Sequence, residues 1–308
     1  MLQRKLNGIK NKYYMNKILT IAIPTYNRPD KIFTQVVGIL PQLTSEVCLI
    51  VLDNHSDIPV IDLFDEEVKL KCEFIRNKQN IGADANIAKC FDLCETPWLI
   101  VLGDDDPLET FAVETILNDI KQADKNTIFL NYDEKQQYIA YGLDEFLKHC
   151  DKRYWCLFWM SGCVYNIPPL KEFFYQYFYS ISTMQPNIIL LVNVLAAHPE
   201  YCIKVTGKRI HKLAGPETHW NREAFIYASL FVYDVLFKYK DKLESTLFHT
   251  IADLLYRHVI TMVKKEHNFL HAYRIMMRIA KRRGLYNTIR YDFYWFSHCI
   301  YNVVKNGR

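Results

Sequence analysis

Three consecutive aspartates, Asp104, Asp105 and Asp106, follow an apolar run in the stretch WLIVLGDDDPLET, residues 98–110. Carboxylates this close repel one another, so the cluster is favourable only where solvent, a cation or a proton offsets its charge. Oxygen ligands select a hard ion such as Mg²⁺ or Mn²⁺, which typically binds one or two carboxylates together with phosphate oxygens. The cluster therefore predicts a divalent-cation site that is completed by a diphosphate.

A structural role is the alternative for one of these aspartates. Aspartate is favoured at helix N-caps and proline at the first helical position, so one carboxylate is expected to cap a helix that begins near Pro107. Capping accounts for a single carboxylate of the three. The sequence therefore favours a functional cluster in which one member caps the following helix.

Apolar runs rich in β-branched residues alternate with segments whose apolar residues have helical spacing. This alternation predicts βαβ units, and therefore an α/β fold with a doubly wound, mostly parallel, Rossmann-like sheet. Strands are expected at 18–24, 46–53, 72–77, 98–102 and 127–132, with helices within 25–40, 82–94 and 107–120 and a further helix near 187–197.

Each of the first four predicted strands ends in a cluster of small polar or acidic residues. These clusters are TYNR at 25–28, DNHSD at 53–57, NKQNIG at 77–82 and GDDD at 103–106. Ligands of open α/β sheets bind outside the carboxyl ends of the strands, so the four loops are expected to form one site.

The segments IAIPTYNR, VLDNHSD, NKQNIGADAN and LGDDD, in this order and at these distances, resemble the inverting family 2 glycosyltransferases of GT-A fold. The resemblance covers roughly residues 17–132. It implies a nucleotide-sugar donor, with a UDP-sugar favoured, held by a DxD-type aspartate cluster and Mn²⁺ or Mg²⁺. It also implies transfer to a glycan or lipid-linked saccharide acceptor, as in bacterial capsule or lipooligosaccharide synthesis.

The resemblance assigns the nucleotide pocket to the first two loops. Thr25, Tyr26 and Arg28 would line the pocket, with Tyr26 against the base or ribose or, alternatively, packed on the sheet edge. Asp53 matches the carboxylate that accepts a base imino hydrogen, and it has a turn-forming role as its alternative. Asn54 lies beside Asp53, at a position that is usually acidic in the family.

The third loop matches the NxGxxxN pattern of the family through Asn80, Gly82 and Asn86. Gly82 would allow the backbone to approach the ligand closely. For Asn86, a place on the helix surface is the alternative. Arg76 is expected either to meet phosphate or to face water, and the sequence does not separate these two roles.

The family's metal motif is usually an aspartate, any residue and two further aspartates, and Gly103 stands where the first aspartate would be. Under that alignment Asp105 is the expected metal ligand and Asp104 lies near the ribose. Asp106 supports the cluster or caps the helix. The register is uncertain by one position, so all three aspartates are metal-ligand candidates.

The general base is the part of the family pattern that this chain does not match. The stretch that usually carries an acidic pair reads TMQPNIILL, in which Gln185 and Asn187 are uncharged. Glu217 is the nearest acidic candidate for the base. His211 and His219 are expected to contact diphosphate or nothing, and the acceptor-side loop resembles that of the family at residues 161–162.

Three parts are expected along the chain: a leader at 1–16, the GT-A domain at 17–215 and a helical region at 216–308. The last 90 residues hold 15 Lys and Arg against 7 Asp and Glu, whereas the whole chain has a net charge of only +4. These basic helices suggest either peripheral contact with the inner membrane or a solvated face. We expect a cytoplasmic protein with no nucleic-acid partner.

Two other functions remain open at this point. A sugar-nucleotide nucleotidyltransferase also combines an α/β sheet with acidic residues, but PTYNRPD is a poor phosphate loop. A non-catalytic nucleotide-sugar-binding relative would fit the uncharged base position. The nine cysteines include no CxxC pair, so reduced thiols are expected, with Cys90 and Cys94 in the core.

Overall fold

The computed structural model describes residues 16–149, 156–157 and 159–212, together with Val232, Val235 and Tyr239. Almost all of the expected leader and of the helical region 216–308 therefore lies outside the described residues. The base candidate Glu217 and the diphosphate candidate His219 lie outside them as well.

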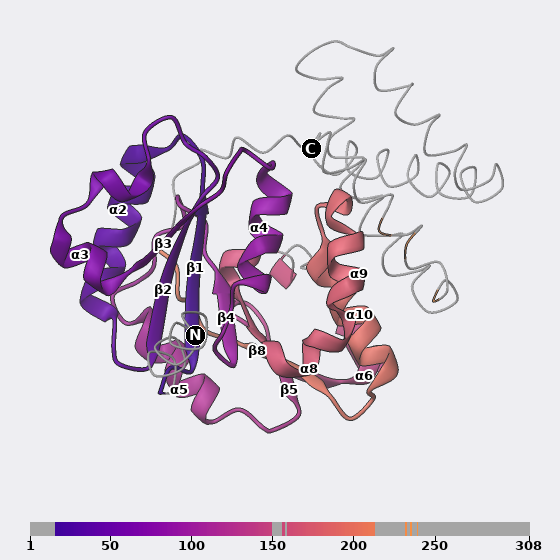
Figure 1. The fold of residues 1–308 in the computed structure, drawn as a ribbon. Coiled ribbons are helices and arrows are strands. Elements are labelled where there is room, and N and C mark those ends of the chain that lie inside the picture. The colour runs from indigo at the N-terminus through magenta and orange to yellow at the C-terminus, as the bar shows by residue number, and fades with distance from the viewer. Residues whose placement is uncertain are drawn as a thin grey trace, which may run out of the picture.

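The described strands form one eight-stranded sheet in the order β3-β2-β1-β4-β7-β5-β8-β6 (Figure 1). Strands β1, β2, β3 and β4 pair in parallel, whereas β7 is antiparallel to β4 and β5, and β6 is antiparallel to β8. The bounds are β1 Leu19–Thr25, β2 Val47–Asp53, β3 Glu73–Arg76, β4 Trp98–Val101, β5 Thr127–Asn131, β6 Gln137–Tyr141, β7 Cys163–Asn166 and β8 Cys202–Thr206.

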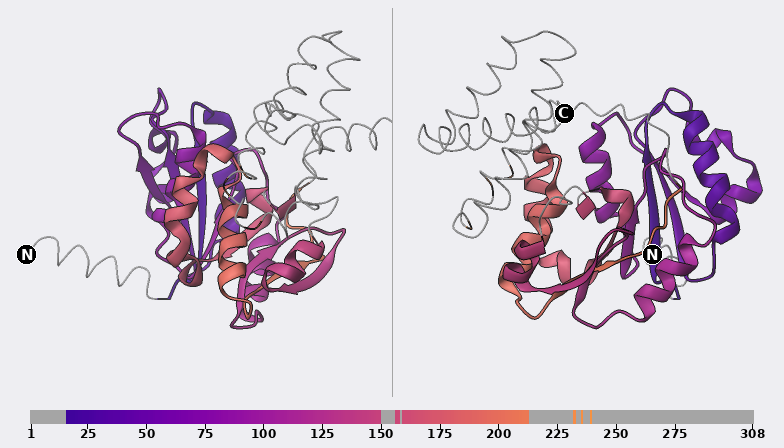
Figure 2. Two further views of the ribbon diagram at one scale, coloured as in Figure 1. Left: turned by 90° about the vertical axis from the view of Figure 1, so that its right-hand side faces the viewer. Right: turned by 180° about the vertical axis from the view of Figure 1, so that it is seen from behind.

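Helices cover both faces of the sheet, as the views in Figure 2 show. One face carries α2 Pro29–Ile39, α3 Glu66–Lys71 and α5 Ala112–Lys121, and the other carries α4 Ala83–Asp92, α6 Gly142–His149, α8 Ile167–Leu170, α9 Phe174–Tyr179 and α10 Pro186–Ala197. Short 3-10 turns are η1 Leu40–Gln42, η2 Val60–Leu63, η3 Met160–Gly162, η4 Lys171–Phe173 and η5 Ile181–Thr183. The prediction of an α/β, mostly parallel, doubly wound sheet is confirmed.

The alternation of side chains along β1 divides the core into two clusters. Ile21 and Ile23 pack with Ile32 and Val36 of α2, whereas Ala22 faces the opposite cluster, which contains Phe91 of α4. Successive side chains of a strand point to opposite faces, so a strand that is apolar throughout is covered on both sides. This accounts for the continuous apolar runs in the sequence.

The five predicted strands are confirmed to within one or two residues, and β6, β7 and β8 were missed. The expected helix at 187–197 is also confirmed, as α10. The missed strands are four or five residues long, and β6 is a half-exposed edge strand. Short strands of this kind lack the sustained periodicity that identifies a strand from sequence.

One expectation about the acidic segment is wrong. Helix α5 begins at Ala112 rather than near Pro107, so none of the three aspartates caps it. The backbone of the intervening residues pairs instead with the chain after β8: Glu109 N–H donates to Ile210 O at 2.8 Å, and Lys212 N–H donates to Pro107 O at 2.9 Å. These contacts hold residues 107–109 in an extended form.

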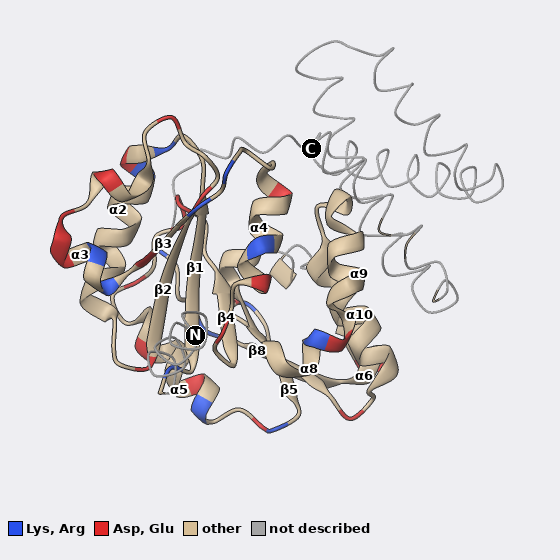
Figure 3. Cartoon of the chain, viewed as in Figure 1, with Lys and Arg blue, Asp and Glu red and all other residues tan. Residues whose placement is uncertain are grey.

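The seven cysteines that the structure describes are all buried, and none of them forms a disulfide with another described residue. Cys90 and Cys94 are 1% and 5% exposed and lie in the core as expected, and their burial raises the pKa of both thiols. Among the described residues, every helix is too short or too polar to cross a membrane. Acidic and basic residues are interspersed over the described helices, so the aspartate cluster is a local feature (Figure 3).

Candidate functional site

The loops after β1, β2, β3 and β4 meet at the carboxyl edge of the sheet, as parallel pairing requires. Asn54 N–H donates to Thr25 O at 2.9 Å, and Asn77 N–H donates to Asp53 O at 2.8 Å. The Thr25 hydroxyl donates to the carboxylate of Asp104 at 2.6 Å, which joins the first loop to the acidic one. The structure therefore brings the four polar clusters together.

Arg28 provides a positive charge within the acidic loop. Its Nη1 pairs with Asp104 Oδ1, and its Nη2 lies 2.7 Å from Asp105 Oδ2. Burial would lower the pKa of Arg28, but its bonds to Asp105 and the charges of both aspartates outweigh burial and raise it. The guanidinium thus offsets part of the repulsion between the aspartates, a role that the sequence suggested for a bound ion.

Asp104 and Asp105 have different surroundings. Asp104 is buried, with 5% of its side chain exposed, and Thr25 and Arg28 occupy its two oxygens. Burial raises the pKa of Asp104, and these two partners oppose the rise. Asp105 is 37% exposed, so its carboxylate is the one in this pair that a ligand can reach.

Asp106 is held from the opposite side of the loop. The Ser161 hydroxyl donates to Asp106 Oδ2 at 2.5 Å, and the indole N–H of Trp159 donates to the same oxygen at 3.3 Å. The buried Gln35 side chain donates to the carbonyls of Gly103 and Asp106 at 3.0 and 2.9 Å. These contacts fix the shape of the loop in which Asp105 is exposed.

Gly103 departs from the family's metal motif for a steric reason. A Cβ atom at this position would lie 2.6 Å from Asp106 Oδ2 and 3.4 Å from Ser161 Oγ. The backbone N–H of Gly103 also donates to Ser161 Oγ at 2.9 Å, which keeps the serine close to this position. An aspartate at 103 would therefore displace the Ser161–Asp106 contact.

The donor set suits a hard dication that brings other ligands with it. Among the residues that the structure describes, no three Asp, Glu, His or Cys side chains converge on a common point. A Mg²⁺ or Mn²⁺ ion needs only one or two carboxylates when phosphate oxygens and waters complete its shell. Asp105 fits this role as a single exposed carboxylate, and its role as the ligand stays a prediction.

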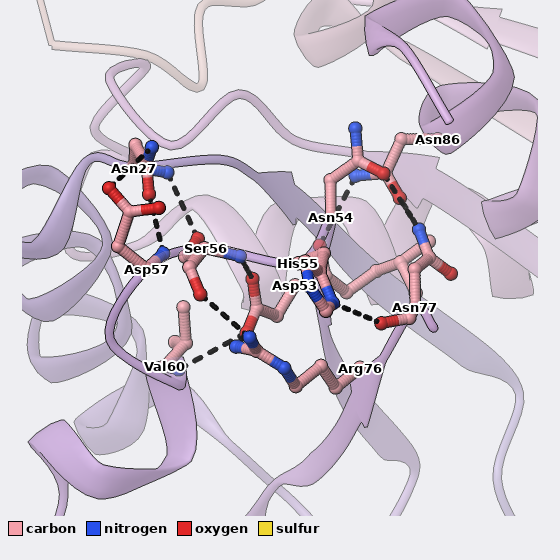
Figure 4. A network of polar contacts seen from close by, with 11 residues as sticks. Asn27, Asp53, Asn54, His55, Ser56, Asp57, Val60, Arg76, Asn77 and Asn86 are labelled. Atoms are coloured by element: carbon pink, nitrogen blue, oxygen red, sulfur yellow. Dashed lines mark hydrogen bonds and ion pairs between the residues drawn. The ribbon is translucent and has the colours of Figure 1, made fainter. Parts of the chain in front are cut away.

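Asp53 organises the turn after β2 (Figure 4). Its carboxylate is 3% exposed and accepts from the backbone N–H groups of Ser56 at 2.7 Å and Val60 at 3.3 Å. Arg76 donates to the same carboxylate at 2.6 Å and to Ser56 O at 2.7 Å. Arg76 therefore pairs with Asp53 in the free protein, with 33% of its side chain exposed, and its contact with phosphate stays a prediction.

A network of side-chain amides joins the second and third loops. Asn77 donates to Asn54 Oδ1 at 2.9 Å and to Asn86 Oδ1 at 2.7 Å, and Asn54 donates to Asn80 Oδ1 at 2.9 Å. Asn86 is 2% exposed and donates to Leu52 O, so the alternative of a helix-surface position is wrong. Asn77 belongs to the third loop predicted from the sequence but was not singled out there as a site residue, although it directly follows β3.

Two residues at this edge have the backbone or exposure that a ligand site requires. Gly82 has φ +86° and ψ 158°, a region that glycine alone adopts readily, and it leads into α4. Tyr26 is 42% exposed beside the buried Thr25, so its ring is accessible to a base or ribose. Contact between Tyr26 and a nucleotide stays a prediction.

His211 lies inside the protein and supports the loop that carries Ser161. Its Nε2 is 2.6 Å from Ser161 O, and its ring centroid is 4.5 Å from that of Trp159. Burial lowers the pKa of His211, which favours the neutral ring. The imidazole is 5% exposed, so it is placed to position Ser161 rather than to reach a ligand.

The stretch that usually carries the family's acidic pair is buried in this chain. Gln185 and Asn187 are each 1% exposed at the start of α10. Asn187 donates to Leu157 O at 3.2 Å and to the Tyr165 hydroxyl at 3.1 Å. Asn187 thus joins α10 to β7 through Tyr165, and neither amide carries a charge with which to accept a proton.

The sequence of the site region matches a known family. Residues 20–157 match the family model described as glycosyl transferase family 2, and this segment holds all four loops of the site. The segment belongs to glycosyltransferase family 2. No curated protein matches the chain.

The fold of the chain is shared with solved structures of S. aureus TarS. Residues 1–349 of TarS align with a TM-score of 0.54 and 12% identity, over 82% of this chain and 74% of TarS. The same part of TarS in complex with UDP-GlcNAc aligns with a TM-score of 0.53 and 12% identity, over 80% and 74%. At this identity the likeness shows a GT-A-like fold.

Proposed function

We propose that this glycosyltransferase moves a sugar from a UDP-sugar to a hydroxyl of a glycan or lipid-linked saccharide, with inversion and with Mn²⁺ or Mg²⁺. The observation that carries the proposal is the exposed carboxylate of Asp105 among four polar loops at one sheet edge. A TarS structure of the same fold holds UDP-GlcNAc, which supports a UDP-sugar as the donor.

The roles of the side chains follow from their surroundings. Asp105 would hold the ion, and a bound ion supplies positive charge that offsets the charge growing on the leaving diphosphate. Thr25 and Arg28 hold Asp104, while Ser161 and Trp159 hold Asp106, so the loop keeps its shape around Asp105. Tyr26 is the exposed aromatic ring that would stack against the nucleotide.

In the proposed reaction an acceptor hydroxyl attacks the anomeric carbon of the sugar from the face opposite the diphosphate. The new carbon–oxygen bond forms as the bond to the diphosphate breaks, and UDP leaves with the electron pair. A carboxylate takes the proton of the hydroxyl, a step that general base catalysis accelerates by about 10²–10⁴-fold.

Asp84 is our candidate for that base among the described residues. It lies in the first turn of α4, at the edge of the sheet where the four loops meet, and burial raises its pKa. Helix α4 packs against η5, which ends at Thr183, two residues before Gln185. Helix α4 therefore lies beside the stretch where the family usually carries its acid, and Asp84 is the acidic residue in the first turn of this helix. Glu217, outside the described residues, is the second candidate.

Asp105→Asn tests the proposed function. Donor turnover, measured as UDP release from a panel of UDP-sugars with Mn²⁺, is expected to fall about 100-fold or more, because the carboxylate that holds the ion loses its charge. Asp62→Asn, at an exposed aspartate of η2, is the matched control and is expected to keep full turnover. Full activity in EDTA, or of the Asp105 variant, would contradict the proposal.

A non-catalytic nucleotide-sugar-binding protein is the second candidate function. The uncharged and buried Gln185 and Asn187 favour it, because they leave the usual base position without a carboxylate. UDP binding without any release of sugar from the panel would support this alternative. Release of pyrophosphate from UTP and a sugar phosphate would instead indicate a nucleotidyltransferase.

The setting of the reaction is also a proposal. We place the enzyme on the cytoplasmic face of the inner membrane, in capsule or lipooligosaccharide synthesis, with the basic region 216–308 as the contact. The excess of Lys and Arg in that region, which lies almost wholly outside the described residues, supports this placement. Co-sedimentation of the full chain with anionic vesicles, absent with neutral ones, tests the contact.

A further inference from the structure

The acidic loop already has a cation of its own. Arg28 reaches the two neighbouring carboxylates of Asp104 and Asp105 with the two arms of one guanidinium, and the Asp105 arm is 2.7 Å long. The carboxylate that we assign to a dication is therefore paired with an arginine in the free protein. A dication and a guanidinium repel each other, so a dication that binds Asp105 weakens its contact with Arg28.

We propose that Arg28 is the counter-cation of Asp105 in the free protein and exchanges places with the dication when the donor binds. The guanidinium then pairs with the donor's diphosphate. This inference rests on the proposed function, and it adds a role for Arg28 that the metal motif does not contain.

The surroundings of the two partners allow this exchange. Arg28 and Asp105 have side chains that are each 37% exposed, so their contact lies open to solvent and ligand. Asp104 is 5% exposed and retains the Thr25 hydroxyl at 2.6 Å if Arg28 leaves. Arg28 is the N-cap residue of α2, and its side chain makes no capping bond there, so its movement leaves the helix intact.

Charge favours the exchange only when the diphosphate is present. The three aspartates and Arg28 sum to −2, and a dication that takes Asp105 leaves Arg28 with one carboxylate partner in place of two. A diphosphate supplies the missing partner, because arginine pairs with phosphate oxygens through two parallel N–H bonds. The dication and UDP should therefore each strengthen the binding of the other, and linkage requires the two effects to be equal.

Mn²⁺ binding to the full chain, followed by the electron paramagnetic resonance of free Mn²⁺, tests this inference without any turnover. For the wild-type protein we expect weak binding that tightens about tenfold or more with saturating UDP. In Arg28→Gln, binding without UDP is expected to tighten about tenfold, because Asp105 is no longer masked, and the effect of UDP is expected to shrink correspondingly.

Two further variants separate this role from a general effect of charge or folding. Arg209→Gln removes the same charge from a 40%-exposed arginine that pairs with Glu109, and it is expected to leave Mn²⁺ binding unchanged. Arg28→Lys keeps the charge without the two-armed contact and is expected to fall between wild type and Arg28→Gln. Thermal unfolding curves verify that each variant is folded.

Unchanged Mn²⁺ affinity in both Arg28 variants would overturn the inference. A wild-type Mn²⁺ affinity that is the same with and without UDP would overturn it as well. Retention of tight UDP binding by Arg28→Gln without any metal would show that Arg28 does not meet the diphosphate, and would overturn it too. The proposed transferase function fails separately, through the turnover of Asp105→Asn.

Discussion

Gly103→Ala tests the packing that shapes the acidic loop. The added Cβ would lie 2.6 Å from Asp106 Oδ2, and real Cβ atoms essentially never approach closer than 3.0 Å. The φ of Gly103 lies outside the left-handed region, so the backbone accepts alanine. The destabilising part of the effect therefore comes from displacement of the Asp106 carboxylate.

The size of the effect follows from the bonds that this carboxylate would lose. Ser161 donates to Asp106 Oδ2 at 2.5 Å, and a hydrogen bond to a charged group contributes about 1.5–3 kcal/mol. Alanine restricts the unfolded chain more than glycine does, which returns about 0.4–1 kcal/mol. The free energy of unfolding is therefore expected to fall by about 1–2 kcal/mol.

Urea denaturation followed by tryptophan fluorescence measures this loss, and Gly38→Ala is the matched control. Gly38 lies inside α2 with nothing within 4 Å of its added Cβ, so alanine there is expected to stabilise the protein by about 1 kcal/mol. In an Asp106→Ala background the cost of Gly103→Ala should largely disappear, because the nearest remaining atom is Ser161 Oγ at 3.4 Å. Equal costs in both backgrounds would refute the steric explanation.

Two further predictions concern α4. Burial raises the pKa of Asp84 above its ordinary 3.8. The contribution of Asp84 to the free energy of unfolding is therefore fully present below pH 3.8 and is lost as pH rises through the raised pKa. Asp84→Asn is therefore expected to stabilise the protein at pH 7 and not below pH 3.8; an equal gain in urea denaturation at both would contradict this. Gly82→Ala is expected to lower the free energy of unfolding by about 1–3 kcal/mol, because of its φ of +86°, and an unchanged urea midpoint would contradict this.

The sequence by itself determined the parallel half of the sheet and the place of the site. Apolar runs such as Leu19–Thr25 and Val47–Asp53 alternate with helical spacing, and that local pattern is enough to identify βαβ units. Parallel strands send their carboxyl ends to one edge, so the convergence of the four polar loops followed from the pattern. The burial of Cys90 and Cys94 followed from helical spacing in the same way.

Only the tertiary structure decided what each polar side chain contacts. Thr25 meets Asp104 across 79 positions, Arg28 meets Asp105 across 77, and Ser161 meets Asp106 across 55. These contacts depend on β4 lying between β1 and β7, an order that includes an antiparallel strand of four residues. Periodicity records which face of an element is apolar, but it does not record which loops the strand order places side by side. For that reason the sequence predicted a divalent cation beside the aspartates. Only the fold showed that the guanidinium of Arg28 pairs with Asp104 and Asp105 in the free protein.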